Sequence, residues 1–226
     1  MIFCKELNKE FATKHEMLSE LYKNRDRIIS IKKAHIHTHK RVALRFYDVD
    51  TKKAHCAKVM KEIGGLDKDF IYPVISNTNY VDSHKDAHMD GSMNRTVKNQ
   101  QGKVHYAINH KLEIGSIVAY PEDVEMLIKE VEWSSLGKDY TGTTQVLLFK
   151  TNLQDYSPDA ARKAIENKLP VENSIKMQYV QIKLGIKERN KEWADANKSW
   201  DDNISKIVNR ADVEDEGVIW FVTELK

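Results

Sequence analysis

The fold class of this chain is decided by one stretch, Ser174-Ile175-Lys176-Met177-Gln178-Tyr179-Val180-Gln181-Ile182-Lys183-Leu184. It predicts the longest β-strand, which we expect to continue to Ile186. Residues 145–150 and 217–225 predict two more strands, each rich in apolar and β-branched side chains. Because helices or long connections separate most of the expected strands, the pattern indicates an α+β protein.

Helical patterns surround these strands. Residues 5–31 carry apolar side chains at helical spacing without Gly or Pro, which predicts one amphipathic helix. Pro121-Glu122-Asp123 predicts a helix running to residue 129, because proline suits the first turn and acids favour the N-terminal dipole. Ser157-Pro158-Asp159 predicts a helix to about residue 168 with Ser157 as its N-cap, and residues 188–208 predict a charged helix. We also expect strands at residues 34–46, 70–76, 104–108 and 115–119, and helices at residues 50–63 and 92–98.

Composition limits the classes of function. The 226 residues favour one domain with embellishments or two small domains. A net charge of +2 gives no electrostatic argument for binding nucleic acid, and no apolar run approaches the ~18–20 residues that span a membrane. The N-terminus has no signal-peptide pattern. Cys4 and Cys56 form no CxxC motif, so we expect no metal-binding or disulfide framework and a reducing cytoplasm.

Two histidine-rich segments suggest a metal site. In His35-Ile36-His37-Thr38-His39, the period of a strand would place three imidazoles on one face, as zinc requires. The other reading is a solvated strand face between basic neighbours. The segment Asp82-Ser83-His84-Lys85-Asp86-Ala87-His88-Met89-Asp90-Gly91 brings His and Asp together as metal hydrolases do. It reads equally as a polar loop whose Asp90 caps the following helix.

Two further residues, His110 and Ser174, suggest nucleophilic catalysis. His110 follows the expected strand at residues 104–108, and a histidine at a strand end can act as a general base because its pKa lies near neutrality. Ser174 begins the longest strand, and a serine nucleophile needs an adjacent base. Taken separately, His110 is read more simply as an exposed turn histidine, and Ser174 as a serine that starts a strand.

The order of these segments along the chain resembles the order of motifs in a known protein family. The Asp-rich lead-in at residues 82–91 precedes a short helix, then Tyr106-Ala107-Ile108-Asn109-His110 and Ile114-Gly115, and finally the Ser174 segment with its Tyr-Val-x-Ile-x-Leu strand. In this order, the span from about residue 74 to residue 225 resembles the prohead (capsid maturation) proteases of tailed phages, relatives of the herpesvirus assemblins.

The resemblance implies a fold and a set of site residues. Ser174 would be the nucleophile and His110 the general base, with an acidic third group on the C-terminal strand, for which Glu224 is the candidate. Asp86 and His88 are alternatives for that third group. The implied fold is α+β, a small, closed or nearly closed antiparallel β-barrel surrounded by helices. Residues 71–226 would form this domain, and residues 1–70 an N-terminal helical arm or small subdomain.

The implied function is a serine endopeptidase that cleaves scaffold and capsid precursor proteins during phage head assembly. It would act in the host cytoplasm and inside the prohead without cofactor, metal, nucleic acid or membrane, and analogy with the herpesvirus enzymes suggests a homo-oligomer. Because the chain stops in an expected strand at Lys226, where family members continue, we expect a trimmed or self-processed product.

Two departures from the family pattern lead to an alternative. Lys176 stands where the family usually has Gly, and Asn173 where it often has His or another polar group. A lysine places a bulky cation beside the expected site, whereas Gly would allow close backbone approach. The Lys176 departure favours a catalytically inactive, protease-fold structural component of the phage head or virion, with the N-terminal arm docking onto partners. A metal-dependent hydrolase using the histidine-rich segments is the third hypothesis.

Overall fold

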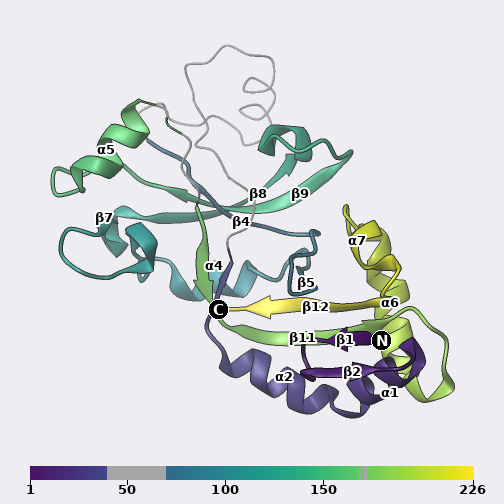
Figure 1. The fold of residues 1–226 in the computed structure, drawn as a ribbon. Helices are drawn as coiled ribbons and strands as arrows, with labels where there is room; N and C mark the ends of the chain where they lie inside the picture. Colours follow the sequence, from purple (N-terminus) through teal and green to yellow (C-terminus); the bar gives the residue numbers. More distant parts are fainter. Residues whose placement is uncertain (40–69, 168, 170–172) are drawn as a thin grey trace. The chain divides into compact units, whose positions relative to one another are not determined.

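The computed structural model describes residues 1–39, 70–167, 169 and 173–226. The chain divides into two compact units (Figure 1). Unit 1 comprises Met1–Ile36, Asn79–Ser92 and Gln178–Leu225, and unit 2 comprises the described parts of His37–Thr78 and Met93–Met177, with Lys226. The helix expected after Asp50 lies outside the described residues, as does Cys56. The expected domain boundary at residue 70 borders this same gap.

Unit 1 is built on a three-stranded sheet in the order β11 (Tyr179–Ile186), β12 (Val218–Leu225) and β5 (Asp86–His88). Strands β11 and β12 are antiparallel, whereas β12 and β5 are parallel. The strand expected at residues 217–225 is therefore confirmed. A cluster of buried apolar side chains packs on this sheet: Val81, Ala87, Met89, Trp200, Ile207, Val213, Ile219 and Phe221.

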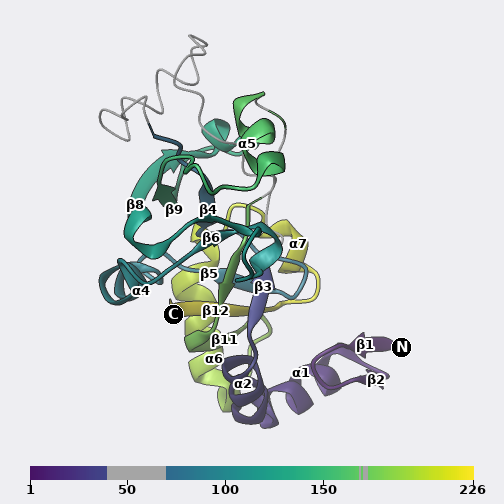
Figure 2. The ribbon, with the colours of Figure 1, turned by 90° about the vertical axis from the view of Figure 1, so that its left-hand side faces the viewer.

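The N-terminal part of unit 1 corrects one prediction. Residues 5–31 do not form one helix, because the chain first makes a hairpin of β1 (Ile2–Cys4) and β2 (Lys9–Phe11) that turns at Asn8, where φ is 49°. Helix α1 (Lys14–Lys23) begins at a capping box in which Thr13 and Glu16 satisfy each other's backbone N–H groups. Helix α2 (Arg25–Ala34) follows at Asn24 (Figure 2).

The C-terminal helical region of unit 1 is shorter than predicted. Instead of one helix at residues 188–208, the chain forms η4 (Lys191–Trp193), α6 (Ala194–Asn203) and η5 (Ile204–Lys206), and α7 (Ala211–Glu214) follows. Asn190 caps the first turn by accepting a hydrogen bond from the Glu192 N–H at 2.9 Å. Trp193 and Trp200 are buried. Within the described ranges, no helix is long and apolar enough to cross a membrane.

Unit 2 contains an antiparallel sheet in the order β4 (Val74–Asn77), β9 (Thr143–Lys150) and β8 (Glu125–Glu132). The strand expected at residues 145–150 is confirmed as part of β9. The prediction of a helix at residues 121–129 was wrong, because only η2 (Pro121–Asp123) is helical in this segment. From Glu125 onward the chain pairs with β9 over eight residues, and this ladder outweighs the local helical signal.

Smaller elements complete unit 2. Helix α5 is confirmed at Asp159–Glu166, but Ser157 is not its cap, because the Ser157 hydroxyl donates to the Val118 carbonyl at 2.7 Å. Asp90, which belongs to unit 1, likewise does not cap α4, whose N-cap is Met93. The Asp90 carboxylate instead accepts hydrogen bonds from the Asn79 amide of the same unit. The remaining elements of unit 2 are β3 (His37–His39), α4 (Asn94–Gln100), β6 (Tyr106–Ala107), η1 (Ile108–His110), β7 (Ile117–Ala119), η3 (Trp133–Leu136) and β10 (Ile175–Met177).

The protein is mixed α and β, as predicted, but no closed barrel is formed by the residues that the structure describes. The strands in the described part of the chain lie in five separate small sheets. The strand expected at residues 174–186 is interrupted at Gln178, so that β10 pairs with β3 in unit 2 and β11 pairs with β12 in unit 1. The stretch that was expected to form one long strand therefore contributes to two different sheets.

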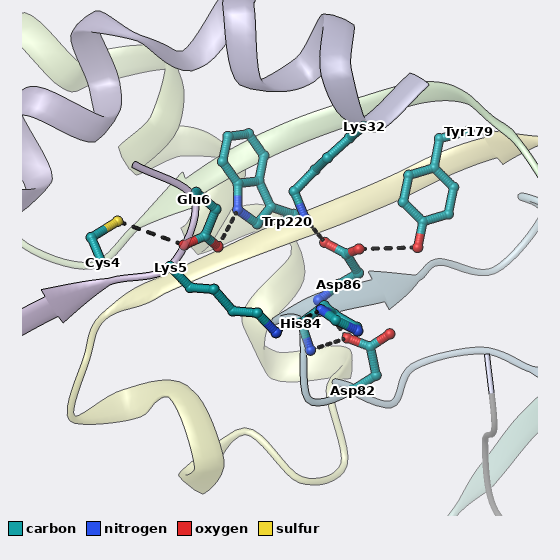
Figure 3. Close-up of polar contacts among 9 residues, drawn as sticks. All are labelled: Cys4, Lys5, Glu6, Lys32, Asp82, His84, Asp86, Tyr179 and Trp220. Atoms are coloured by element: carbon teal, nitrogen blue, oxygen red, sulfur yellow. Dashed lines mark hydrogen bonds and ion pairs between the residues drawn. The ribbon is translucent and has the colours of Figure 1, made fainter. Parts of the chain in front are cut away.

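A buried ion pair holds helix α2 to the sheet of unit 1 (Figure 3). The Lys32 ammonium donates to Asp86 Oδ1 at 2.5 Å and lies 5.3 Å from the ring centre of Trp220. The Tyr179 hydroxyl donates to Asp86 Oδ2 at 3.0 Å. Asp86 is 1% exposed, and burial raises the pKa of its carboxyl while the Lys32 charge opposes this rise. The pair thus compensates a charge that would otherwise be costly to bury.

This contact predicts the effect of two neighbouring substitutions. Lys32→Met leaves Asp86 buried without its cation and should lower the free energy of unfolding by about 3–5 kcal/mol. Lys33→Met removes an exposed lysine from the same helix and should change it by less than about 0.5 kcal/mol. Urea unfolding of both variants measures the difference; equal losses would contradict the role of the ion pair.

Candidate active site

His110 lies in the loop of a short hairpin in unit 2. Strands β6 and β7 pair antiparallel, and the Ile108 N–H donates to the Ser116 carbonyl at 2.7 Å, which closes the base of the loop. Asn109 and His110 have φ values of 52° and 56°, the left-handed region that non-glycine residues seldom adopt. Such conformations persist where surrounding contacts hold them, and they are frequent at functional sites.

Ser174 directly precedes β10, which pairs with β3 through the register Ile175–His39 to Met177–His37. Its neighbour Asn173 is 5% exposed and accepts a 2.8 Å hydrogen bond from the Tyr106 hydroxyl. Burial raises the pKa of Tyr106 far above its ordinary value, so the phenol remains a hydrogen-bond donor. This contact anchors the residue before Ser174 to strand β6.

The structure brings the two predicted residues together. His110 Nε2 lies 2.7 Å from Ser174 Oγ, although 64 residues separate them in the chain. Both side chains are half-buried, so that each retains access to solvent. An imidazole nitrogen at this distance can accept the hydroxyl proton, which is the geometry that activates a serine nucleophile.

The electrostatic surroundings favour the neutral form of His110. Burial lowers the pKa of its imidazole, and the positive charge of Lys176 lowers it further. The ring is therefore unprotonated at pH 7 and has a nitrogen lone pair for a proton. Lys176 itself is exposed.

The third catalytic group stays a prediction. Glu224 belongs to β12 of unit 1, where its carboxylate accepts a 2.9 Å hydrogen bond from the Gln181 amide. Asp86 is engaged by Lys32 and Tyr179 in the same unit. His88, the other alternative, is fully buried with its ring edge-on to Tyr179. Among the described residues, no carboxylate hydrogen-bonds to His110.

The histidine-rich segments do not assemble a metal site within the part of the chain that the structure describes, where no group of three or more His, Cys, Asp or Glu side chains could hold an ion. His35 is the C-cap of α2 and lies outside β3 (His37–His39), so the three histidines do not share one strand as predicted. His84 Nδ1 lies 3.2 Å from the Lys5 ammonium (Figure 3).

Sequence reasoning missed two residues of the site, Tyr106 and Asn173. Tyr106 precedes His110 by four residues, and Asn173 immediately precedes Ser174. The only available signal was Asn173 itself, which departs from the family pattern. The structure shows that the residue before the serine is a buried acceptor for a tyrosine hydroxyl.

No protein-family model, no curated protein and no solved structure matches the chain. The resemblance to prohead proteases therefore depends on the order of the quoted motifs.

The Tyr106–Asn173 contact can be tested by removing one hydroxyl. Tyr106→Phe removes the hydroxyl that donates to buried Asn173 and should lower the free energy of unfolding by about 1–3 kcal/mol. The control is Tyr156→Phe, because the Tyr156 hydroxyl donates to Asp123 at an exposed position and should contribute less. Thermal unfolding compares the two; an equal or larger loss in Tyr156→Phe would contradict the anchoring role.

Proposed function

We propose that this protein is a serine endopeptidase of the prohead-protease kind, which cleaves scaffold and capsid precursor proteins during phage head assembly. The observation that carries the proposal is the 2.7 Å separation of His110 Nε2 and Ser174 Oγ. The order of motifs that resembles the prohead proteases supports the substrate class and a fold related to the herpesvirus enzymes.

The proposed mechanism uses the two residues in turn. Ser174 Oγ attacks the scissile carbonyl carbon while His110 Nε2 accepts the hydroxyl proton. The imidazolium then donates this proton to the leaving amine, and an acyl ester remains on Ser174. The neutral imidazole next takes a proton from water, whose oxygen attacks the ester, and returns it to Ser174 Oγ. The attack by Ser174 and the later attack by water each require His110 to be neutral at the start, which agrees with its lowered pKa.

One observation favours the alternative of a catalytically inactive structural component. The Lys176 charge that keeps His110 neutral also opposes the imidazolium that forms in the transition state. A metal-dependent hydrolase gains no comparable support from the described residues.

Cleavage of a tailed-phage scaffold or capsid precursor tests the protease directly. Wild-type protein should cleave the precursor, whereas Ser174→Ala and His110→Gln should lose roughly 10³-fold or more of the rate, since the nucleophile and its base act as a unit. Ser134→Ala should retain the wild-type rate, because Ser134 is exposed on η3 and its hydroxyl donates to Glu132 of β8. Cleavage that persists in Ser174→Ala would overturn the proposal, and no cleavage by any form would support the structural alternative.

The pH profile of this cleavage follows from His110. The active form is unprotonated, so the rate should fall as pH decreases through the pKa of His110. Because that pKa is lowered, the fall should occur below pH 6.5, the ordinary histidine value. Initial rates between pH 4.5 and 8 measure the midpoint. A midpoint above pH 6.5 would contradict the assignment of His110 as the base in this environment.

A further inference from the structure

Lys176 is the departure from the family pattern with the clearest physical consequence. Ser174 and Lys176 are two residues apart, and in an extended segment such residues face the same side. The burial pattern agrees, because Lys176 is exposed whereas Met177, on the opposite side of β10, is 2% exposed. Ser174 directly precedes β10, and the alternation of the strand, continued back by one residue, places the Lys176 side chain on the side of the nucleophile.

The charge of Lys176 acts on the base of the same pair. Other titratable groups lie on the elements around His110: Tyr106 on β6, Lys111 and Glu113 in the same loop, and His37 on β3. Among the described residues, Lys176 is the charged group that, with burial, favours neutral His110. A neutral histidine is ready to accept a proton, but an adjacent cation makes the resulting imidazolium less stable. Lys176 thus restrains the Ser174–His110 pair, because it disfavours the transfer of the Ser174 proton to His110.

A carboxylate beside Lys176 removes this restraint. It neutralises the ammonium, and its own negative charge stabilises the imidazolium. We propose, on the basis of the proposed protease function, that Lys176 is a specificity residue that restrains the Ser174–His110 pair until an acidic side chain of the bound peptide neutralises it. The site then selects acidic peptide segments, because the peptide carboxylate that Lys176 binds also neutralises the Lys176 charge.

The first test compares matched peptides that differ only in Glu or Gln at each position around the cleaved bond. Wild type should show at least one position at which Glu raises kcat/KM by roughly 2- to 5-fold, the range expected for an exposed ion pair. Lys176→Gln should lose this preference, and Lys176→Glu should reverse it in favour of the Gln peptide. Lys111→Gln, which removes an exposed charge beside His110 in the chain, should keep the preference. A preference that survives in Lys176→Gln would overturn the proposal.

A second test does not depend on catalysis. NMR titration should show a higher pKa for His110 in Lys176→Gln than in wild type, because a positive charge has been removed, and a smaller change in Lys111→Gln. In Ser174→Ala, saturating Glu peptide should raise the pKa of His110, and the Gln peptide should not. If no form cleaves any peptide but the pKa responds in this way, the protease fails while the recognition by Lys176 stands. An unchanged pKa in Lys176→Gln overturns the inference.

Discussion

The candidate site depends on two hydrogen-bond contacts between the β6–β7 hairpin and residues 173–174. Tyr106 donates to buried Asn173, and His110 lies at hydrogen-bond distance from Ser174. The first contact gives a buried amide oxygen its donor, and the second places a base on a hydroxyl. The pairing of β10 with β3 supports the same segment from its other end. A loop histidine in a left-handed conformation is thereby held against a serine distant in sequence.

The electrostatics of this site have two opposing effects on His110: they favour its neutral form, and they make its protonated form less stable. Burial and Lys176 both keep His110 neutral, so that the base is available at pH 7. The same two influences make the protonated ring less stable, which weakens the base in the transition state. An enzyme with this arrangement gains from a substrate that supplies negative charge. A structural protein with the same arrangement would simply hold an unreactive serine.

Local sequence signals predicted the elements whose stability is local or whose strands are strongly apolar, such as β9, β12 and α5. They failed where pairing with distant residues decides the outcome. The helix predicted at residues 121–129 is replaced from Glu125 onward by a strand, because this segment pairs with β9. The single strand predicted at residues 174–186 is divided, because β10 and β11 pair in different sheets. The site shows the same division: motif order indicated His110 and Ser174, whereas the Tyr106–Asn173 contact joins residues 67 apart and left no pattern in the sequence.

The central claim is that Ser174 is a nucleophile activated by His110. Reaction with a fluorophosphonate, followed by tryptic digestion and mass spectrometry, tests it without a known substrate. The expected peptide covers residues 169–176, in which Ser174 is the only hydroxyl-bearing residue. Our account predicts a phosphonyl adduct on this peptide in wild type, and none in Ser174→Ala or His110→Gln. An unmodified Ser174 in folded wild-type protein, or equal modification when His110 is replaced, would contradict it.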